Sequence, residues 1–408
     1  MQHSRPLYGG LDVHKDSSAV ADGANDHDAE VISLGPIGTR QCDIDQRVRQ
    51  LQAKATPLVF VYEAGPWGYW RYRELTQTSY DGWVVAPSLI PKQAGDHVKP
   101  DRRDAVHWAR LLRSGALTPV DVPTVEDDAI RDLRRAREAT LHDVNTATFR
   151  RKALLLRHDI RSTGRATWGP AHRRWRSEVV CPTPAQPIVL QEDVRAVTEH
   201  TERLHRRAQD LHEHVNAWRL SPVVEALQAL RGVQVTVAVT LIAKLGDLTR
   251  VDNPRPRMKY VGLTPAEDAR GERRRQGGIT KTGPTPARRA LLEGAWAARD
   301  PAHVSRHLQR RLEKRPKPLQ DISWKAQARL CKRSRQLSAR GTHPHQVVVA
   351  SARELIALMW AIAKQVPVTA SIRRPHGRCI EGPQEFPGQV PLSIGRGAAP
   401  VWCTPRAR

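Results

Sequence analysis

The sequence lacks the cysteine pattern of a disulfide-stabilised or zinc-binding protein. Its 408 residues include five cysteines, an odd number, and no two of them form a C-x-x-C pair. Disulfide-stapled domains carry a dense, even set of cysteines, and structural zinc sites use closely spaced pairs. The scattered cysteines therefore argue against both classes of protein.

A membrane-spanning or targeting segment is also missing from the pattern. Residues 1–8 have no apolar core, and the most apolar run, residues 233–243, is short and interrupted by threonine. A helix that crosses a bilayer needs about 20 predominantly apolar residues. We therefore expect a cytoplasmic protein with no membrane partner.

Acidic residues are in deficit relative to basic ones. The chain has 66 Lys and Arg against 42 Asp and Glu, which gives a formal net charge of +24 and an isoelectric point near 10.7. A polyanionic partner explains this excess most simply, and nucleic acid is favoured because the cations are spread through segments of mixed character. A genome-wide bias toward arginine is the alternative.

Hydrophobic periodicity divides the chain into four stretches. Residues 1–122 alternate short apolar runs with helical patterns, which predicts an α/β domain. We expect its strands at residues 8–13, 57–62 and 82–86, with residues 17–21 continuing or pairing with the first, and its helices at residues 43–53, 70–78 and 101–114.

Residues 123–221 have the pattern of long, charged helices. After an expected helix at residues 126–158 and a basic loop at 161–187, apolar residues recur in steps of four and three. This spacing is typical of a coiled coil, with the first helix or a second subunit as partner, although an ordinary long helix on a globular core fits it too. The seam consists of Leu190, Val194, Val197, Thr201, Leu204, Ala208, Leu211, Val215 and Trp218.

Residues 222–366 form the third stretch and 367–408 the fourth. Two short helices are expected at residues 223–230 and 236–245, around a turn at Arg231 and Gly232. Such a pair resembles a helix-hairpin-helix element, whose turn amides bind a DNA phosphate, but any helical hairpin has the same pattern. Past residue 367 the chain is rich in Pro and Gly without periodicity, which predicts a disordered tail.

Four acidic residues come from three separate elements of the first stretch. Asp12 lies near the end of the first strand, Glu63 follows the buried strand, and Asp101 and Asp104 are spaced i, i+3 at a helix start. Converging carboxylates can hold the two Mg²⁺ or Mn²⁺ ions that cofactor-free phosphoryl transfer on DNA requires. Taken singly, Asp101 and Asp104 could complement a helix dipole and Asp12 could cap a turn.

Basic residues gather in two places in the third stretch. The first cluster surrounds a glycine-containing loop and the start of the next helix, and it can follow a phosphate backbone. Residues 306–340 form the second, expected as a helix whose Trp324, Leu330 and Leu337 pack while its cations face phosphate. A solvated helix face is the alternative. The first cluster is Arg270, Arg273, Arg274, Arg275, Lys281, Arg288 and Arg289.

The chain resembles the Asp-Glu-Asp-Asp insertion-sequence transposases of the "IS-one-ten" family. The stretches that carry the resemblance, in order, are residues 8–16 (YGGLDVHKD), 62–69 (YEAGPWGY), 85–91 (VAPSLIP), 99–105 (KPDRRDA), 227–233 (LQALRGV), 260–265 (YVGLTP) and 277–283 (GGITKTG). The resemblance then continues from residues 324–327 (WKAQ) to residues 360–363 (WAIA), so that it covers about residues 7–365.

The resemblance implies a fold and an activity. The fold would be an RNase H-like domain of the RuvC type, a helical coiled-coil insertion and a mainly helical C-terminal transposase domain with a helix-hairpin-helix element. Asp12, Glu63, Asp101 and Asp104 would be the metal-binding catalytic positions. Family members cut and rejoin DNA, a structured RNA guides those studied, and a homodimer or homotetramer is expected.

The chain departs from the family at its nucleophilic serine. Family members have Ser-Ser-Gly after the Gly-Leu-Thr-Pro stretch, whereas Ala269 and Arg270 stand there here, and neither side chain can form a phosphoester. Pro284-Thr-Pro286 also replaces the usual Asn-x-His. Three hypotheses stay open: a transposase, active or decayed; a junction-resolving nuclease that uses only the acids; and an inactive DNA- or RNA-binding remnant.

Overall fold

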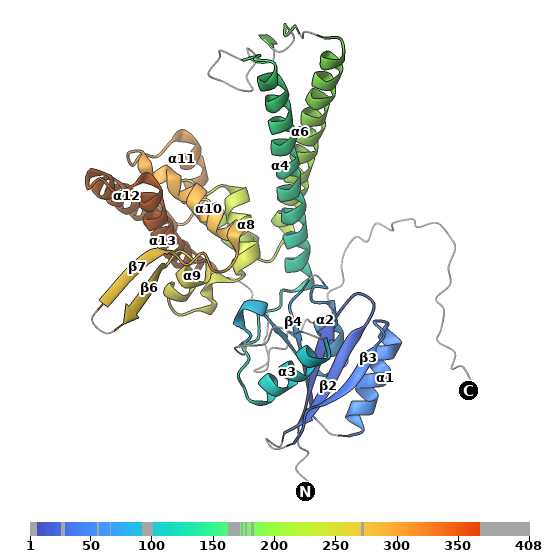
Figure 1. Cartoon of the computed structure of the whole chain (residues 1–408). Coiled ribbons are helices and arrows are strands. Elements are labelled where there is room, and N and C mark those ends of the chain that lie inside the picture. Colours follow the sequence, from blue (N-terminus) through green and yellow to red (C-terminus); the bar gives the residue numbers. More distant parts are fainter. Residues whose placement is uncertain are drawn as a thin grey trace. The chain divides into compact units, whose positions relative to one another are not determined.

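The computed structural model describes residues 6–25, 29–54, 57–65, 67–91, 101–161, 172, 174–175, 178–180, 183–270 and 273–367, without the side chains of residues 101, 102, 269, 270, 273 and 274. These residues form two compact units, one ending at Val122 and one beginning at Pro123 (Figure 1). The predicted tail, residues 367–408, lies outside the described residues except for residue 367.

The first unit is built on a mixed five-stranded sheet in the order β3-β2-β1-β4-β5. Strand β1 pairs antiparallel with β2, which pairs antiparallel with β3, while β1, β4 and β5 run parallel to one another. The strands are β1 (Leu7–Val13), β2 (Ser18–Ala24), β3 (Ile32–Ile37), β4 (Leu58–Glu63) and β5 (Asp81–Val85).

Helices cover both faces of this sheet. α1 (Gln41–Gln52) and α2 (Trp70–Gln77) pack on one face, where their apolar side chains meet those of alternate strand residues such as Leu11 and Phe60. α3 (Asp101–Arg113) packs on the other face, where Trp108 and Leu112 meet Val61 and Val85. A 3₁₀ turn (η1, Pro87–Leu89) follows β5. The predicted α/β alternation is therefore confirmed, and residues 18–24 pair with the first strand.

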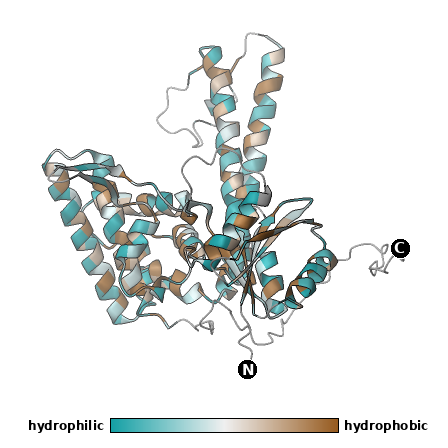
Figure 2. Ribbon diagram, turned by 60° about the horizontal axis from the view of Figure 1, so that its bottom comes forward, coloured by the Kyte–Doolittle hydropathy of each residue, from teal (hydrophilic) through white to brown (hydrophobic). Residues whose placement is uncertain are grey.

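The second unit begins with two long helices, α4 (Val125–Arg157) and α6 (Ala185–Ala217), which pack along each other. Leu190, Val197, Leu211 and Val215 are the buried residues of α6, and all four belong to the predicted seam. Hydrophobic residues recur in bands along both helices (Figure 2). At the base, the Trp218 indole N–H donates to Asp127 over 2.8 Å. The seam is thus packed against α4 of the same chain.

The remainder of the second unit is a mainly helical bundle around one apolar core. Helix α8 is buried on most sides. Helix α10 packs against both α8 and α13. The elements are α7 (Ser221–Leu227), α8 (Val235–Leu245), η2 (Leu248–Arg250), α9 (Arg255–Tyr260), β6 (Pro265–Arg270), β7 (Arg273–Ile279), α10 (Thr285–Ala295), η3 (Trp296–Arg299), α11 (Arg306–Leu312), α12 (Lys317–Ala339) and α13 (Pro344–Ala363).

Helix α13 is long and apolar enough to cross a membrane by length and composition. The interpretation of residues 233–243 as the most apolar run therefore overlooked this helix. Half of its most apolar window is buried, and Ala352, Leu355 and Ile362 lie in the core of the second unit. That burial is the behaviour of a core helix.

Three expectations for the second unit were wrong. The basic cluster was expected around a loop, whereas the backbones of residues 270 and 273–275 belong to the paired strands β6 and β7. Residues 306–340 form two helices, α11 and α12. Pro316 is the N-cap of α12 and Pro318 lies in its first turn, where proline favours a helix start. Trp324 is 51% exposed, so it does not belong to the packed side of α12.

Candidate functional site

Asp12 is a buried carboxylate at the end of β1. Only 7% of the residue is exposed, and its Oδ1 lies 3.5 Å from Nδ1 of His14. A charged carboxylate in such a position costs free energy unless cations or hydrogen-bond donors compensate it. The burial of Asp12 therefore indicates a role beyond solubility.

Glu63 ends the neighbouring parallel strand. Leu11 pairs with Tyr62 in the β1–β4 register, and Asp12 and Glu63 are the next residues on their strands. Side chains alternate between the two faces of a sheet, so both acids share a face with Gly10 and Val61. That face is covered by α3, because Val61 packs in the cluster that contains Trp108.

Helix α3 runs opposite to β1, so its first residues lie at the edge that carries the two acids. A Cβ on Gly10 would come within 2.0 Å of the Ala105 carbonyl oxygen, which shows how closely the helix approaches the strand. At the far end, Arg113 donates to the Ala24 carbonyl oxygen over 3.3 Å, and Ala24 pairs with Leu7 at the start of β1. Asp101, the first residue of α3, and Asp104 therefore lie near the carboxyl ends of β1 and β4.

The four predicted acids thus occupy one edge of the sheet, but their convergence stays a prediction. Asp104 is partly exposed, and the side chain of Asp101 is outside the described set. Among the side chains that are described, no three or more His, Cys, Asp or Glu are grouped closely enough to hold a metal ion. The hard carboxylate oxygens and the burial of Asp12 fit a divalent cation in chemistry.

Tyr62 fixes the loop that follows Glu63, a role that the sequence analysis missed. Its hydroxyl accepts a hydrogen bond from the Tyr72 N–H over 3.2 Å and donates to the Gly68 carbonyl oxygen over 3.4 Å. Burial raises the pKa of this phenol above its usual range, so it stays protonated and able to donate. The only signal in the sequence was a tyrosine at the last position of an otherwise fully apolar run.

Arg231 and Gly232, predicted to contact DNA at a helical turn, lie within the fold. The Arg231 guanidinium donates to the Pro301 carbonyl oxygen over 2.7 Å and also approaches Gln327 and Asp300. Gly232 has a φ of +84°, and a Cβ there would come within 2.2 Å of the Gly294 carbonyl oxygen. The bonds of Arg231 and the close approach of Gly232 to Gly294 both indicate that this turn stabilises the fold.

The other predicted basic residues divide into internal and exposed ones. Arg288 is 9% exposed and donates to the carbonyl oxygens of Val261 and Thr282, so it holds the chain together at the start of α10. Arg289 is half exposed and pairs with Glu138 over 2.8 Å. Arg275 and Lys281 are exposed. The backbones of Arg270, Arg273 and Arg274 lie at the end of the hairpin, as does that of Ala269, which pairs with Arg274.

A further basic cluster, not found from the sequence, lies where α4 meets α8. Arg131 donates to the Ala243 carbonyl oxygen over 2.6 Å, near Lys244. Burial, followed by the charges of Arg135, Arg134 and Arg131, lowers the pKa of Lys244 to about 8. Arg134 pairs with Glu138 and Arg135 with Asp132, so nearby carboxylates offset part of the repulsion among these four cations.

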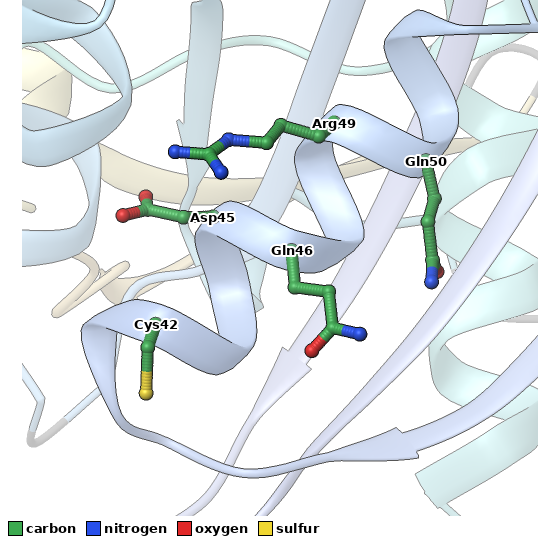
Figure 3. Close-up of a pocket in the computed structure, with 5 residues that line it drawn as sticks. All are labelled: Cys42, Asp45, Gln46, Arg49 and Gln50. Carbon is green, nitrogen blue, oxygen red and sulfur yellow. The ribbon is translucent and has the colours of Figure 1, made fainter. Parts of the chain in front are cut away.

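A shallow pocket on the first unit contains none of the predicted site residues. It lies on α1 and is lined by Cys42, Asp45, Gln46, Arg49 and Gln50, whose side chains are polar and do not converge on one point (Figure 3). It carries no catalytic arrangement.

Comparisons with known proteins match both halves of the chain. The model of the DEDD transposases of IS110 type matches residues 9–159, and the model described as "Transposase IS116/IS110/IS902 family" matches residues 224–309. The chain is 40% identical to "Putative transposase y4qE" of Sinorhizobium fredii over 90% of this chain and 91% of that protein. It is 27% identical to "Transposase for insertion sequence element IS1533" of Leptospira borgpetersenii over 82% and 97% of the two chains.

Proposed function

The chain belongs to the IS116/IS110/IS902 transposase family, and we propose that it cleaves and rejoins the DNA of an insertion sequence at a centre formed by Asp12, Glu63, Asp101 and Asp104. Because the chain belongs to this transposase family, DNA is its binding partner, and the DEDD domain suggests that the protein uses a divalent metal ion. It also implies an RNase H-like fold for the first domain, with which the mixed sheet and its two helical layers agree.

One observation carries the assignment of the acids. Asp12 and Glu63 follow a paired position on adjacent parallel strands, on the face that α3 covers, and the start of α3 lies at the same edge. Open sheets place their sites at the carboxyl ends of parallel strands. The four positions therefore come from three elements that the fold brings to one edge.

The ions would be Mg²⁺ or Mn²⁺, which activate an attacking oxygen and stabilise a leaving oxygen when bound. The protein residues would fix the geometry: Asp12 and Glu63 are attached to rigid strands, and Gly10 allows α3 to approach closely enough to bring Asp101 and Asp104 to them. Tyr62 would position Glu63 by holding the loop that follows it. Rigid support of this kind keeps reacting groups aligned.

The test is strand cleavage of element-end DNA with Mg²⁺. We expect Asp12→Asn and Glu63→Gln to abolish cleavage, because each removes a charged ligand without changing its size. Asp16→Asn is the matched control, since Asp16 is exposed a few residues beyond Asp12. Cleavage by Asp12→Asn at the wild-type rate would overturn the assignment.

A guide RNA and a homo-oligomer are further proposals from the family resemblance. The seam of α6 is occupied by α4 of the same chain, so a coiled-coil hairpin would have to associate through other residues. Leu156, Ile188 and Val189, near the far end of the hairpin, are 49–65% exposed and support a contact there. Light scattering with and without the RNA measures the mass of the protein and of any protein–RNA complex. A monomeric protein under both conditions would reject the dimer or tetramer, and a mass unchanged by the RNA would reject the guide RNA.

The domain limits 123–221, 222–366 and 367–408 and the helix-hairpin-helix assignment of α7 and α8 also remain proposals. The Arg231 side chain bonds to the Pro301 carbonyl oxygen within the fold. We therefore propose that Arg231 holds the turn between α7 and α8 in place, and that the backbone amides of the turn contact the DNA phosphate. A cytoplasmic location is also proposed, because transposases act on DNA inside the cell.

We propose that this copy still cleaves DNA at the acids but completes strand exchange poorly, because the family's serine positions hold Ala269 and Arg270. Restoring both serines is the test: a covalent protein–DNA product that only the restored variant forms would support impairment, and one formed by the wild type would refute it. Cutting of branched DNA without a covalent product would favour the junction-resolving nuclease. Binding without any cutting would favour the inactive remnant.

A further inference from the structure

Helix α12 exposes a large aromatic ring. Trp324 is 51% exposed, while the neighbouring Ser323 and Ala326 are buried on the opposite side of the helix. An exposed tryptophan is unusual among the described residues of the second unit, where Trp218 is buried and Trp296 and Trp360 pack against the core. The exposed ring of Trp324 is therefore available to contact a ligand.

The same part of the chain holds much of the protein's positive charge. Residues 306–340 contain twelve Lys and Arg but two acidic residues. On α12, Arg329 and Arg333 pair with Glu354 of α13 over 2.7 and 3.0 Å. The single carboxylate of Glu354 offsets one of these two positive charges, and both arginines stay partly exposed.

Other cations of α12 are exposed beside the tryptophan. Lys325, Lys332 and Arg335 are exposed, and no ion pair is recorded for them among the residues that the structure describes. Arg335 lies eleven residues after Trp324, close to three helical turns, so the two share a side of the helix. We call Trp324, Lys325, Lys332 and Arg335 the α12 face.

We propose that the α12 face binds single-stranded DNA, with Trp324 stacking on an unpaired base and the three cations contacting phosphates. Aromatic rings beside cations are how proteins bind single strands without sequence preference. A duplex could use the cations alone, because its bases are already stacked on each other. A lipid or protein partner would require a broader apolar patch than one ring.

The proposal rests on the proposed function, because cutting and rejoining DNA exposes unpaired strands near the protein. It adds a strand-binding surface on the second unit, whereas the acids belong to the first unit. It also explains why Trp324 is exposed to solvent in the free protein, because a bound DNA strand would cover the ring.

Fluorescence anisotropy of labelled oligo-deoxythymidine, in metal-free buffer with the full chain, tests the proposal. We expect Trp324→Ala to weaken single-strand binding roughly tenfold and to leave the affinity for a duplex unchanged. Trp324→Phe, which keeps an aromatic ring, should retain most of the wild-type affinity for the single strand. Lys332→Gln should weaken both ligands and reduce the salt dependence of binding.

Controls separate stacking from folding and from catalysis. Tyr260→Ala removes a ring of matched exposure, 50%, from the same unit and should leave single-strand binding unchanged. The thermal midpoint of Trp324→Ala should match the wild type, because the ring is exposed. Equal weakening of single strand and duplex, or tighter binding of oligo-uridine RNA than of oligo-deoxythymidine, would overturn the proposal. Failure of the proposed function would appear separately, as cleavage that survives Asp12→Asn.

Discussion

Replacing Gly10 by alanine should displace α3 from the sheet and disable the candidate site. The added Cβ would lie 2.0 Å from the Ala105 carbonyl oxygen and 3.0 Å from the Ala109 nitrogen, and both are backbone atoms of α3. Ordinary contact begins near 3.4 Å, so the helix must retreat by more than 1 Å. A misplacement of that size costs about 100-fold in rate, and the overpacking costs about 1–3 kcal/mol of stability.

Gly9→Ala is the matched control on the same strand. Its Cβ would meet the Phe60 ring at 2.5 Å, on the face covered by α1 and α2. It should therefore lower stability without moving the helix that carries Asp101 and Asp104. Gly278→Ala, which meets nothing within 4 Å, controls for the substitution itself.

The assay compares Mg²⁺-dependent cleavage per folded molecule with the unfolding free energy from denaturant titration. Gly10→Ala should lose far more cleavage than its loss of stability explains, whereas Gly9→Ala should cleave normally once corrected for the folded fraction. If both variants lost cleavage only in proportion to unfolding, the close approach of α3 would have no role in positioning the site.

Two other perturbations test the second unit. The pKa of Lys244 falls from 10.5 unfolded to about 8 folded, so its charge opposes folding below pH 8 and the penalty fades as the pH rises from 8 to 10.5. Lys244→Met should therefore stabilise the protein by about 1–2 kcal/mol at pH 7, after allowance for screening, and by nothing above pH 10.5; equal unfolding free energies at pH 7 would contradict this. Arg231→Met should lower the thermal midpoint by several degrees, because the bonds from the guanidinium to the Pro301 carbonyl oxygen and to Gln327 are lost, and leave the salt dependence of DNA binding unchanged. A reduced salt dependence without loss of stability would show that Arg231 contacts phosphate instead.

The sequence was sufficient to locate the elements that have strong hydrophobic patterns. The buried run that became β4 was unbroken and apolar, and the helices α1, α2 and α3 were placed within two residues of their observed limits. These patterns also placed Asp12 and Glu63 at strand ends. Their common edge follows from parallel pairing, which an α/β alternation predicts.

Strands without such patterns were missed for a physical reason. Strand β3 is a half-exposed edge strand that contains Gly35 and Pro36, so it shows no regular apolar alternation. Strands β6 and β7 consist mostly of charged and small residues and owe their structure to pairing with each other. Charge alone suggested a loop there.

The sequence analysis also predicted nucleic-acid contacts for arginines that bond within the fold. Arg231 and Arg288 stand beside turns and glycines, where a phosphate-binding residue would also stand, and only their bonds to carbonyl oxygens distinguish the two roles. Trp324 illustrates the converse, since its spacing suggested packing and its exposure suggests a ligand. Side-chain partners depend on tertiary contacts that periodicity does not encode.

Mn²⁺ binding to the intact protein, measured by calorimetry without DNA, tests the central claim most directly. If the four acids form a shared centre, the wild type and Asp16→Asn should bind Mn²⁺ with equal affinity, and Asp12→Asn, Glu63→Gln and Asp101→Asn should each weaken binding at least about tenfold, as the loss of one charged ligand predicts. Unchanged Mn²⁺ affinity in all three variants would contradict a metal centre at this edge of the sheet.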